Sequence, residues 1–580
     1  MTTDPKGVYE FGPFRLDLGR RALFRGEELL PLAPKSIDTL SLLMESAGAA
    51  VDKATLLSRV WSDTAVEENS LAKAISEIRR ALGEEARTAA IIVTVPGHGY
   101  RFGAAVNRVR PGNQSNRLAV LPLLNLSGNA ADEYLAVGLA DALITRLSRI
   151  QQVVVRPTSA ILRFADRERD AVAAARQLDA DSVVEGTLRR DGDRFRVTVQ
   201  LVGARTGAIE WAGTFDEKVT DIFALEDVIA ERIVAALTLT LTGEEQRSLR
   251  KTTTHSGAAY ESYLEGRFHW NKRTAEGCEQ AIACFERAIA TDPNYVLAYS
   301  GLADAHVALG IQGIVLSGLS PSATFPRART AIANALSLDE GVAEVYTSLG
   351  QVNFFYDWDF TAAESAYRRS IALNPNYATA HHSYAMALTF LNRQAAAMAE
   401  IEQARALEPF SPIINANLGR VLYHARRYEE AIAHLEKTLD LDPSFVLTHH
   451  RLGLAFEANG MYEEATREFT IVQRLSGGGP FATAALGCVY AMSGRRRDAE
   501  QLLESLLETA RQQYVAAPLI AEMCIGLGDN DRAFGWLDRG IEERSSVLVG
   551  LLVNPRYEPV RHDPRFQRVV ERVGLDLVRL

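Results

Sequence analysis

Hydrophobic residues recur with a helical period in residues 68–82 of the chain. Leu71, Ile75, Ile78 and Leu82 stand three or four positions apart, so they share one face of a helix. The residues between them are mostly polar or small. The stretch therefore predicts an amphipathic helix whose polar face is left for solvent or for a partner.

A β-hairpin is predicted directly after this helix. Residues 91–95 read Ile-Ile-Val-Thr-Val, a run of good strand formers, and residues 100–102 read Tyr-Arg-Phe. Between the two runs, Pro96-Gly-His-Gly99 supplies a turn in which glycine permits positive φ. A helix followed by a hairpin with a basic tip is the layout of a winged helix-turn-helix, whose helix enters the DNA major groove and whose hairpin is the wing.

Alanines at a strict spacing of 34 mark the C-terminal half of the chain. A large residue follows each alanine by four positions, and prolines close several of the units. This period is typical of tetratricopeptide repeats, helix pairs that stack into a superhelix. We expect about eight units over residues 256–580, a loop at residues 311–325, and a solvent-facing cap that includes Pro555-Arg-Tyr. The six alanines are Ala363, Ala397, Ala431, Ala465, Ala499 and Ala533.

Predicted strands and helices are interleaved in residues 117–243, which indicates a small α/β layered domain. Residues 106–116 are polar and rich in turn formers, so we expect a linker between this domain and the winged helix of residues 8–105. The expected fold class is multidomain α+β. It combines a winged helix-turn-helix, a small α/β domain and an all-α tetratricopeptide superhelix.

The N-terminal region resembles the OmpR/PhoB-type winged-helix DNA-binding domain. Leu-Ala-Lys-Ala-Ile-Ser-Glu-Ile-Arg-Arg-Ala-Leu at residues 71–82 and Thr-Val-Pro-Gly-His-Gly-Tyr-Arg-Phe at residues 94–102 carry this resemblance. The middle region resembles the TolB-N-terminal-like domain in Val-Val-Glu-Gly-Thr-Leu at residues 183–188, and that domain implies no chemistry. The whole order resembles HilA-like and CadC-like regulators. It implies a one-component, sequence-specific transcriptional regulator whose repeats bind a partner or a signal, or self-associate.

The same resemblance implies which residues contact DNA. Basic side chains suit phosphates, whereas Ser76 and Glu77 could read base edges, because a carboxylate can accept a hydrogen bond from cytosine N4. Glu77 replaces the basic residue common in relatives, which leaves the preferred DNA sequence open. The expected DNA-binding residues are Lys73, Ser76, Glu77, Arg79, Arg80, His98 and Arg101.

Two alternatives remain for this surface. A polar helix face can be a solvated face without a ligand. The winged helix can also bind protein in an interaction scaffold, because acidic and basic residues roughly cancel within the first hundred residues.

Two histidine pairs, His381-His382 and His449-His450, stand two repeats apart. The second member of each pair is expected to face the concave groove of the superhelix. One interpretation is a pH- or ligand-sensing peptide groove; the alternative is a set of polar groove residues without special chemistry. The expected groove residues are His382, Arg420, Tyr423, His424, His450 and Glu457.

Composition narrows the function classes. The net charge of −10 gives no whole-chain reason to bind nucleic acid, so any affinity must come from local placement. Four scattered cysteines suit neither a disulfide scaffold nor a zinc site, and they fit a reducing cytosol. The sequence has no signal peptide and no apolar run of the roughly 18 residues that a membrane helix needs. We therefore expect a cytoplasmic protein without a membrane span.

Catalytic motifs are absent from the sequence. It has no phosphate-binding loop, no His-Glu-x-x-His and no Gly-x-Ser-x-Gly, so we expect no enzyme, catalytic residue, cofactor or metal. No receiver domain precedes the winged helix, so a phosphoaspartate switch within the chain is not expected. The expected partners are double-stranded promoter DNA, RNA polymerase or a protein or peptide ligand at the repeats, and a second copy of the chain.

Overall fold

The computed structural model divides the chain into two compact units, residues 1–115 and residues 116–580. Each unit is described by itself. The structure describes residues 8–11, 14–18, 21–25, 28–46, 50–61, 68–84, 91–104, 107–109, 116–127, 129, 132–150, 152–164, 170–192, 194–218, 222–237, 239, 241, 254, 256–272, 274–316 and 319–575.

An antiparallel sheet opens the first unit, in the order β4-β3-β2-β1-β8. Strand β8 lies inside the stretch 106–116 that the sequence predicted as a linker, and it pairs with β1. The turn-rich composition of that stretch did not reveal the pairing, because the partner strand is about a hundred residues away. The strands are β1 (Val8–Phe11), β2 (Phe14–Asp17), β3 (Ala22–Arg25), β4 (Glu28–Leu30) and β8 (Asn107–Val109).

Three helices and a second small sheet, ordered β5-β7-β6, complete this unit. The apolar face predicted for residues 68–82 forms part of its core: Leu71, Ile75, Ile78 and Leu82 are all at most 5% exposed. The elements are α1 (Pro34–Glu45), β5 (Ala50–Asp52), α2 (Lys53–Val60), α3 (Glu68–Leu82), β6 (Ile92–Val95) and β7 (Gly99–Phe102).

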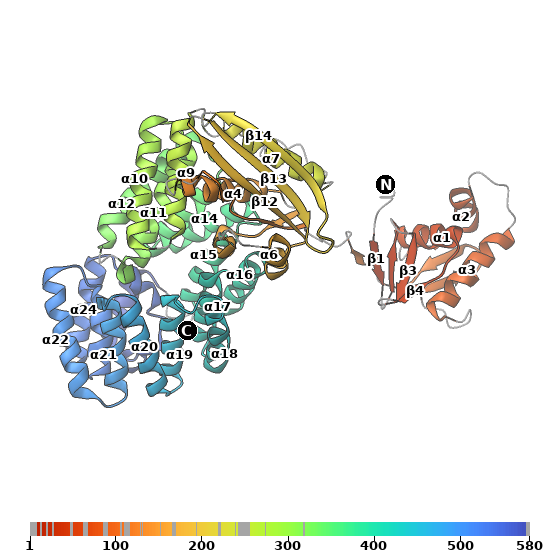
Figure 1. Ribbon diagram of the computed structural model, residues 1–580. Helices are drawn as coiled ribbons and strands as arrows, with labels where there is room; N and C mark the ends of the chain where they lie inside the picture. The colour runs from red at the N-terminus through yellow and green to blue at the C-terminus, as the bar shows by residue number, and fades with distance from the viewer. Residues whose placement is uncertain are drawn as a thin grey trace. The chain divides into compact units, whose positions relative to one another are not determined.

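A mixed sheet in the order β11-β9-β12-β13-β14 forms the start of the second unit, and β10 also pairs with β12. The long strands β12, β13 and β14 are antiparallel neighbours, and helix α7 packs against β13 and β14 (Figure 1). The elements are β9 (Asn116–Val120), β10 (Leu124–Asn125), α4 (Glu133–Leu147), β11 (Val153–Val155), α5 (Thr158–Ile161), η2 (Leu162–Phe164), α6 (Ala171–Gln177), β12 (Ser182–Asp191), β13 (Arg194–Gly203), β14 (Ile209–Lys218) and α7 (Ile222–Ala236).

Eight antiparallel helix pairs follow in the described residues 257–542, and they stack in chain order (Figure 1). The first four pairs are α9 (Gly257–Asn271) and α10 (Ala275–Thr291), α11 (Val296–Leu316) and α12 (Pro321–Leu338), α13 (Ala343–Val352) and α14 (Phe360–Leu373), and α15 (Ala378–Phe390) and α16 (Gln394–Leu407). The other four are α17 (Pro412–His424) and α18 (Tyr428–Leu439), α19 (Val446–Ala458) and α20 (Tyr462–Leu475), α21 (Pro480–Met492) and α22 (Arg496–Gln512), and α23 (Ala517–Gly526) and α24 (Asn530–Glu542). The π-helical turn η4 (Asn353–Asp357) extends α13, and η5 (Ser546–Gly550), η6 (Pro555–Val560) and α25 (Pro564–Val573) end the unit.

The structure corrects the prediction of a loop at residues 311–325. Helix α11 continues to Leu316 and α12 begins at Pro321, so most of the predicted loop is helical. Glycine and serine favoured a loop in the sequence, whereas the packing of α11 against α12 outweighs their low helix propensity.

The 34-residue alanine series occupies the tightest positions between the helices of the array. All six alanines are 0% exposed. Glycines on the first helix of a pair serve the same purpose: a Cβ atom added to Gly419 would lie 2.4 Å from Leu435, and one added to Gly453 would lie 2.5 Å from Phe469. The small–large pattern read from the sequence is therefore close helix packing.

Candidate nucleic-acid interface and the cavity of the repeats

Helix α3 presents a stripe of exposed side chains opposite its buried apolar face. Lys73, Ser76 and Arg80 are three and four positions apart, and all three are exposed. The wing adds His98 and Arg101, which are exposed as well. Five of the seven residues expected to contact DNA are thus accessible on the helix and the hairpin of the winged helix.

Backbone geometry fixes the wing. The turn is closed by a hydrogen bond from the His98 N–H to the Val95 carbonyl, 3.1 Å long. Gly99 has φ of 147°, and a Cβ atom there would lie 2.2 Å from the carbonyl oxygen of Val51 in the neighbouring strand β5. Glycine is therefore needed at this position for β5 and β7 to pair.

Arg79 differs from the expectation, because its guanidinium is used inside the domain. The side chain is buried, and its Nη2 donates to the Ile92 carbonyl at 2.6 Å and to the Thr94 hydroxyl at 2.9 Å. These bonds hold helix α3 against strand β6. The basic residue at this edge of the helix is thus a positioning residue for the wing.

Glu77 is also engaged within the domain. One carboxylate oxygen accepts from the Ala33 N–H at 2.8 Å, and the other accepts from the Ser36 hydroxyl at 2.6 Å. Ala33 is the N-cap residue of α1 and has no side chain that could cap that helix. Glu77 therefore supplies from α3 the negative charge and the acceptors that the N-terminus of α1 needs.

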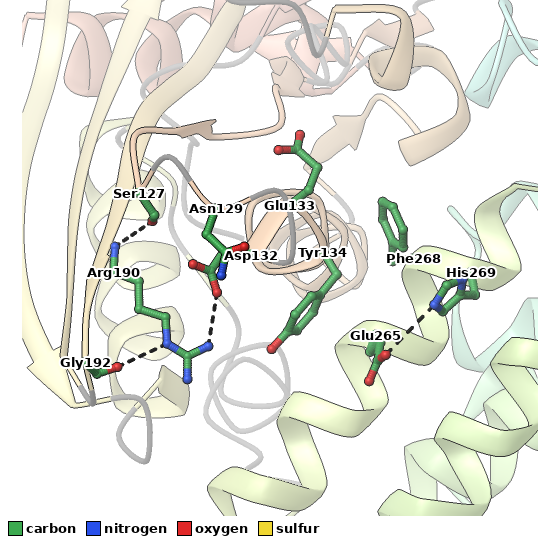
Figure 2. A pocket seen from close by; sticks show the side chains of 10 residues that line it. All are labelled: Ser127, Asn129, Asp132, Glu133, Tyr134, Arg190, Gly192, Glu265, Phe268 and His269. Atoms are coloured by element: carbon green, nitrogen blue, oxygen red, sulfur yellow. Dashed lines mark hydrogen bonds and ion pairs between the residues drawn. The ribbon is translucent and has the colours of Figure 1, made fainter.

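The second unit contains a cavity of about 870 Å³ between the β12–β13 hairpin, the start of α4 and α9. Figure 2 shows Arg190 bonded to Asp132 and to the Gly192 carbonyl. Arg190 also reaches Glu261 at 3.3 Å, and Glu261 accepts a hydrogen bond from Tyr134. The charge of Arg190 in this cavity is thus balanced by the chain's own carboxylates.

Glu265 and His269, which line this cavity, and the nearby Cys284 bring ligand-type atoms within 4.8 Å of one another (Figure 2 shows the first two). Arg287, however, pairs with Glu265 and contacts the Cys284 thiol. Burial raises the pKa of Cys284 to about 11, so the thiol keeps its proton. Because the Arg287 guanidinium already pairs with the Glu265 carboxylate and the thiol is protonated, this arrangement does not favour a metal ion.

A larger cavity, about 1030 Å³, lies in the second unit, where it is lined by the repeats, by the α/β domain and by the C-terminal cap; it is called the cavity of the repeats below. Five of the six expected groove residues line it: His382, Arg420, Tyr423, His424 and His450. The sixth, Glu457, is buried and receives two hydrogen bonds from Arg556, at 2.8 and 2.7 Å.

The C-terminal cap contributes to this cavity, which corrects the prediction of a solvent-facing cap. Arg556 and Tyr557 are buried, and Arg556 also pairs with Glu522 at 3.0 Å. Its partner Glu457 lies 99 positions earlier in the chain. No local pattern signals a contact over that distance.

The first histidine of each pair is a structural residue. His449 donates to the Glu468 carboxylate at 2.7 Å and to the Pro443 carbonyl at 2.9 Å. His381 does the same with Glu400 and Pro375. The hydrogen bond to Glu468 is the main reason why the pKa of His449 is raised, so the charged form is favoured. These histidines tie the start of one helix to the next helix of the pair.

Sequence reasoning missed Arg451, Asn417 and Glu522, which all line the cavity. Asn417 and Arg451 occupy the same position in successive repeats, 34 residues apart, directly after the position of His450. The repeat register that singled out His450 could therefore also have pointed to them.

Four families match parts of the chain. Residues 26–102 match the family "Transcriptional regulatory protein, C terminal", and residues 114–232 match "HilA/YgeH-like transcriptional regulator, second domain". Residues 271–311 match "Tetratricopeptide repeat" and residues 419–460 match "TPR repeat". No described helix is both long and apolar enough to cross a membrane.

Relatives match over different lengths. The chain is 24% identical over 394 residues to the transcriptional regulator HilA of Salmonella typhimurium, which covers 67% of this chain and 68% of HilA. It is 29% identical over 194 residues to putative adenylate cyclase 3 of Rhizobium meliloti, covering 33% of this chain and 32% of that protein. It is 40% identical over 96 residues to the transcriptional regulatory protein CutR of Streptomyces coelicolor, covering 16% of this chain and 42% of CutR. The chain thus spans about a third of the cyclase and less than half of CutR.

Fold and site together define a protein in which a winged helix-turn-helix with an exposed polar stripe is joined to an α/β domain and a tetratricopeptide superhelix. More particularly, the chain carries an OmpR/PhoB-type winged-helix domain, a HilA-like second domain and tetratricopeptide repeats. It has the domain architecture of a transcriptional regulator of the OmpR/PhoB and HilA type.

Proposed function

We propose that this chain is a one-component, sequence-specific DNA-binding regulator of transcription. The observation that carries the proposal is the exposed stripe of Lys73, Ser76 and Arg80 on α3 beside a wing that presents His98 and Arg101. Lysine and arginine would hold phosphates, and Ser76 would face base edges in the major groove. Similarity to HilA and CutR, both named as transcriptional regulators, supports this function.

Glu77 and Arg79 would act indirectly in this proposal. Their hydrogen bonds fix α1 and β6 around α3, so they would set the angle at which the helix and the wing meet DNA. A direct contact from Glu77 to a base would require it to leave Ala33 and Ser36. The preferred DNA sequence would therefore depend mainly on Ser76 and its exposed neighbours.

In this cytoplasmic regulator, the repeats would bind a partner or a second copy of the chain. Two weak DNA contacts held together by self-association would bind more tightly than one, because the second contact becomes intramolecular. Non-enzymatic action fits the matched families. The name of the cyclase belongs to a protein of which this chain spans about a third.

The test measures binding of the full chain to a pool of random double-stranded DNA at several salt concentrations, followed by sequencing of the bound fraction. We expect the logarithm of the affinity to fall linearly with the logarithm of the salt concentration. Replacing both Lys73 and Arg80 with alanine should weaken binding at least tenfold and flatten that slope. Ser76→Ala should change the enriched sequence. Arg511→Ala, on the exposed face of α22, is the control and should leave both unchanged.

The second candidate is an interaction scaffold whose winged helix binds protein, favoured by the near-neutral charge of the first hundred residues. Unchanged DNA affinity in the Lys73→Ala, Arg80→Ala double variant, together with nuclease-resistant capture of proteins, would support the scaffold and contradict the DNA-binding proposal.

A further inference from the structure

In one part of the cavity of the repeats, around His450, three arginines gather beside two glutamates. The charges of Arg420, Arg451 and Arg556 all lower the pKa of His450. The carboxylates that act on Arg556 are those of Glu457 and Glu522. Both carboxylates are bonded to Arg556, at 2.7 and 3.0 Å. Arg420 and Arg451 are left with no carboxylate at ion-pair distance among the described residues.

Arg451 is a buried cation without an ion-pair partner among the described residues. Its side chain lines the cavity, the residue is only 6% exposed, and its Nη1 has no hydrogen-bond partner. Burial, reinforced by the charge of Arg420, lowers the pKa of Arg451 well below its ordinary value. An isolated buried cation is costly, so such a group normally has an anionic partner.

Arg420 stands beside it, half-buried and also without a carboxylate at ion-pair distance among the described residues. Its guanidinium lies over the ring of Phe390, 4.7 Å from the centroid, and burial lowers its pKa to about 10. Asn417 and His424 also line the cavity, and the Asn417 Oδ1 and the His424 Nε2 lack hydrogen-bond partners. Two guanidinium groups therefore line a cavity that also contains two buried polar atoms without hydrogen-bond partners.

Apolar and aromatic side chains also line the cavity near these arginines. The His450 ring packs against the Phe481 ring with the centroids 4.2 Å apart, and Leu454, Met386 and Phe390 line the cavity too. Burial lowers the pKa of His450 well below its ordinary value, so the ring is neutral at pH 7. Such a lining favours an aromatic or aliphatic body attached to the anionic group.

The C-terminal cap and the α/β domain both contact residues of the repeats that line the cavity. The cap inserts Arg556 between Glu457 and Glu522, and the His424 ring meets the Val553 carbonyl at 3.4 Å. On the other side, Asn376 donates to the Ile150 carbonyl of the α/β domain at 3.2 Å. The whole cavity has a volume of about 1030 Å³, slightly above the range of about 300–1,000 Å³ that is typical of small-molecule sites.

We propose that this cavity binds a small organic anion, a carboxylate or phosphate on an apolar or aromatic body, with Arg451 and Arg420 as its anion-binding residues. Guanidinium groups suit both head groups, because their parallel N–H donors match two oxygen atoms of a carboxylate or a phosphate. The inference goes beyond the proposed function, since it assigns a ligand site in the repeats and does not depend on DNA binding.

The experiment uses the full chain and four probes: 2-naphthoate, 2-naphthyl phosphate, neutral 2-naphthol and inorganic phosphate. Binding is measured by isothermal titration calorimetry, and thermal unfolding is followed in parallel. We expect one saturable site per chain for at least one naphthyl anion, at least tenfold tighter than for 2-naphthol or for inorganic phosphate. The stronger of the two naphthyl anions identifies the head group.

Arg451→Met and Arg420→Met should each weaken anion binding at least tenfold, whereas Arg511→Met, exposed on α22, should not. Arg451→Met should also fold with a Tm no lower than that of the unchanged chain, because it removes an unpaired buried charge. Equal binding of 2-naphthol, unchanged binding in both cavity variants, or no binding of either anion at millimolar concentration would overturn the proposal. Binding of an acidic peptide in place of the small anions would also overturn it, in favour of a peptide groove.

Discussion

Neighbouring polar residues on one helix have different roles in this protein. Arg80 is exposed on α3, whereas Arg79 is buried and bonded to β6. Glu77 lies between the exposed stripe and the core and caps α1 from a distance of 44 positions in the sequence. Residues 71–82 resemble a DNA-reading helix as a whole, but the contacts of each side chain separate the exposed positions from the positioning ones.

Glu77→Ala should lower the stability of the first unit. It removes two hydrogen bonds and a favourable charge from the N-terminus of α1, which should cost about 1–2 kcal/mol. Hydrogen exchange of amides in α1, measured on the full chain, reports the change, and Ser76→Ala is the exposed control at under about 0.5 kcal/mol. An unchanged exchange rate combined with an altered DNA preference would instead indicate that Glu77 reads bases.

At the scale of elements, the array is a repeated contact between a small and a large residue. Gly419 on α17 faces Leu435 on α18, and Gly453 on α19 faces Phe469 on α20. At an equivalent position of two successive repeats, a side chain bonds to the carbonyl of the proline six residues earlier. His449 bonds to Pro443 in this way, and Asn415 bonds to Pro409. The repeat thus conserves contact geometry within the chain while the residue types change.

Gly419→Ala should destabilise the array by about 1–3 kcal/mol, because the new methyl would lie 2.4 Å from Leu435 and force it to move. Gly535→Ala is the matched control. It is exposed within α24 and has nothing within 4 Å of the added Cβ, so it should stabilise by up to about 1 kcal/mol. Thermal unfolding measures both variants, and a Tm that falls for Gly535→Ala as much as for Gly419→Ala would contradict the packing explanation.

At the scale of the second unit, the α/β domain and the first repeat share one hydrophobic core. Leu264 and Phe285 of the first repeat belong to the same buried cluster as the strands of the sheet. Asp141 on α4 accepts two hydrogen bonds from Arg267 on α9, at 2.8 and 3.3 Å. Burial alone would raise the pKa of Asp141, but Arg267 and the neighbouring donors outweigh it and lower that pKa. Helices α4 and α9 are thereby held together.

Asp141→Ala should weaken the contact that couples the unfolding of the α/β domain to that of the first repeat. It leaves Arg267 buried without its carboxylate, which should cost about 3–5 kcal/mol. Denaturant unfolding of the full chain should show a lower midpoint for the sheet and the first repeats. Arg196→Ala, which removes an exposed pair with Asp216 on the same sheet, should leave the midpoint nearly unchanged, because water screens exposed ion pairs. Equal effects of the two variants would show that the Asp141–Arg267 contact does not couple the domains.

The sequence by itself determined the features that arise from local periodicity. The apolar face of α3, the turn of the wing and the 34-residue register of buried alanines follow from spacing, because a helix or hairpin fixes which neighbouring residues share a face. The exposed stripe that includes Lys73 and Arg80 follows from the same spacing.

Only the tertiary structure decided the features that depend on residues far apart in the sequence. The pairing of β8 with β1, the attachment of Arg79 to β6 and the insertion of Arg556 beside Glu457 join residues separated by 13 to 101 positions. The two unpaired arginines of the cavity belong to this group as well, because a charge is recognised as unpaired only when every element packed around it is known.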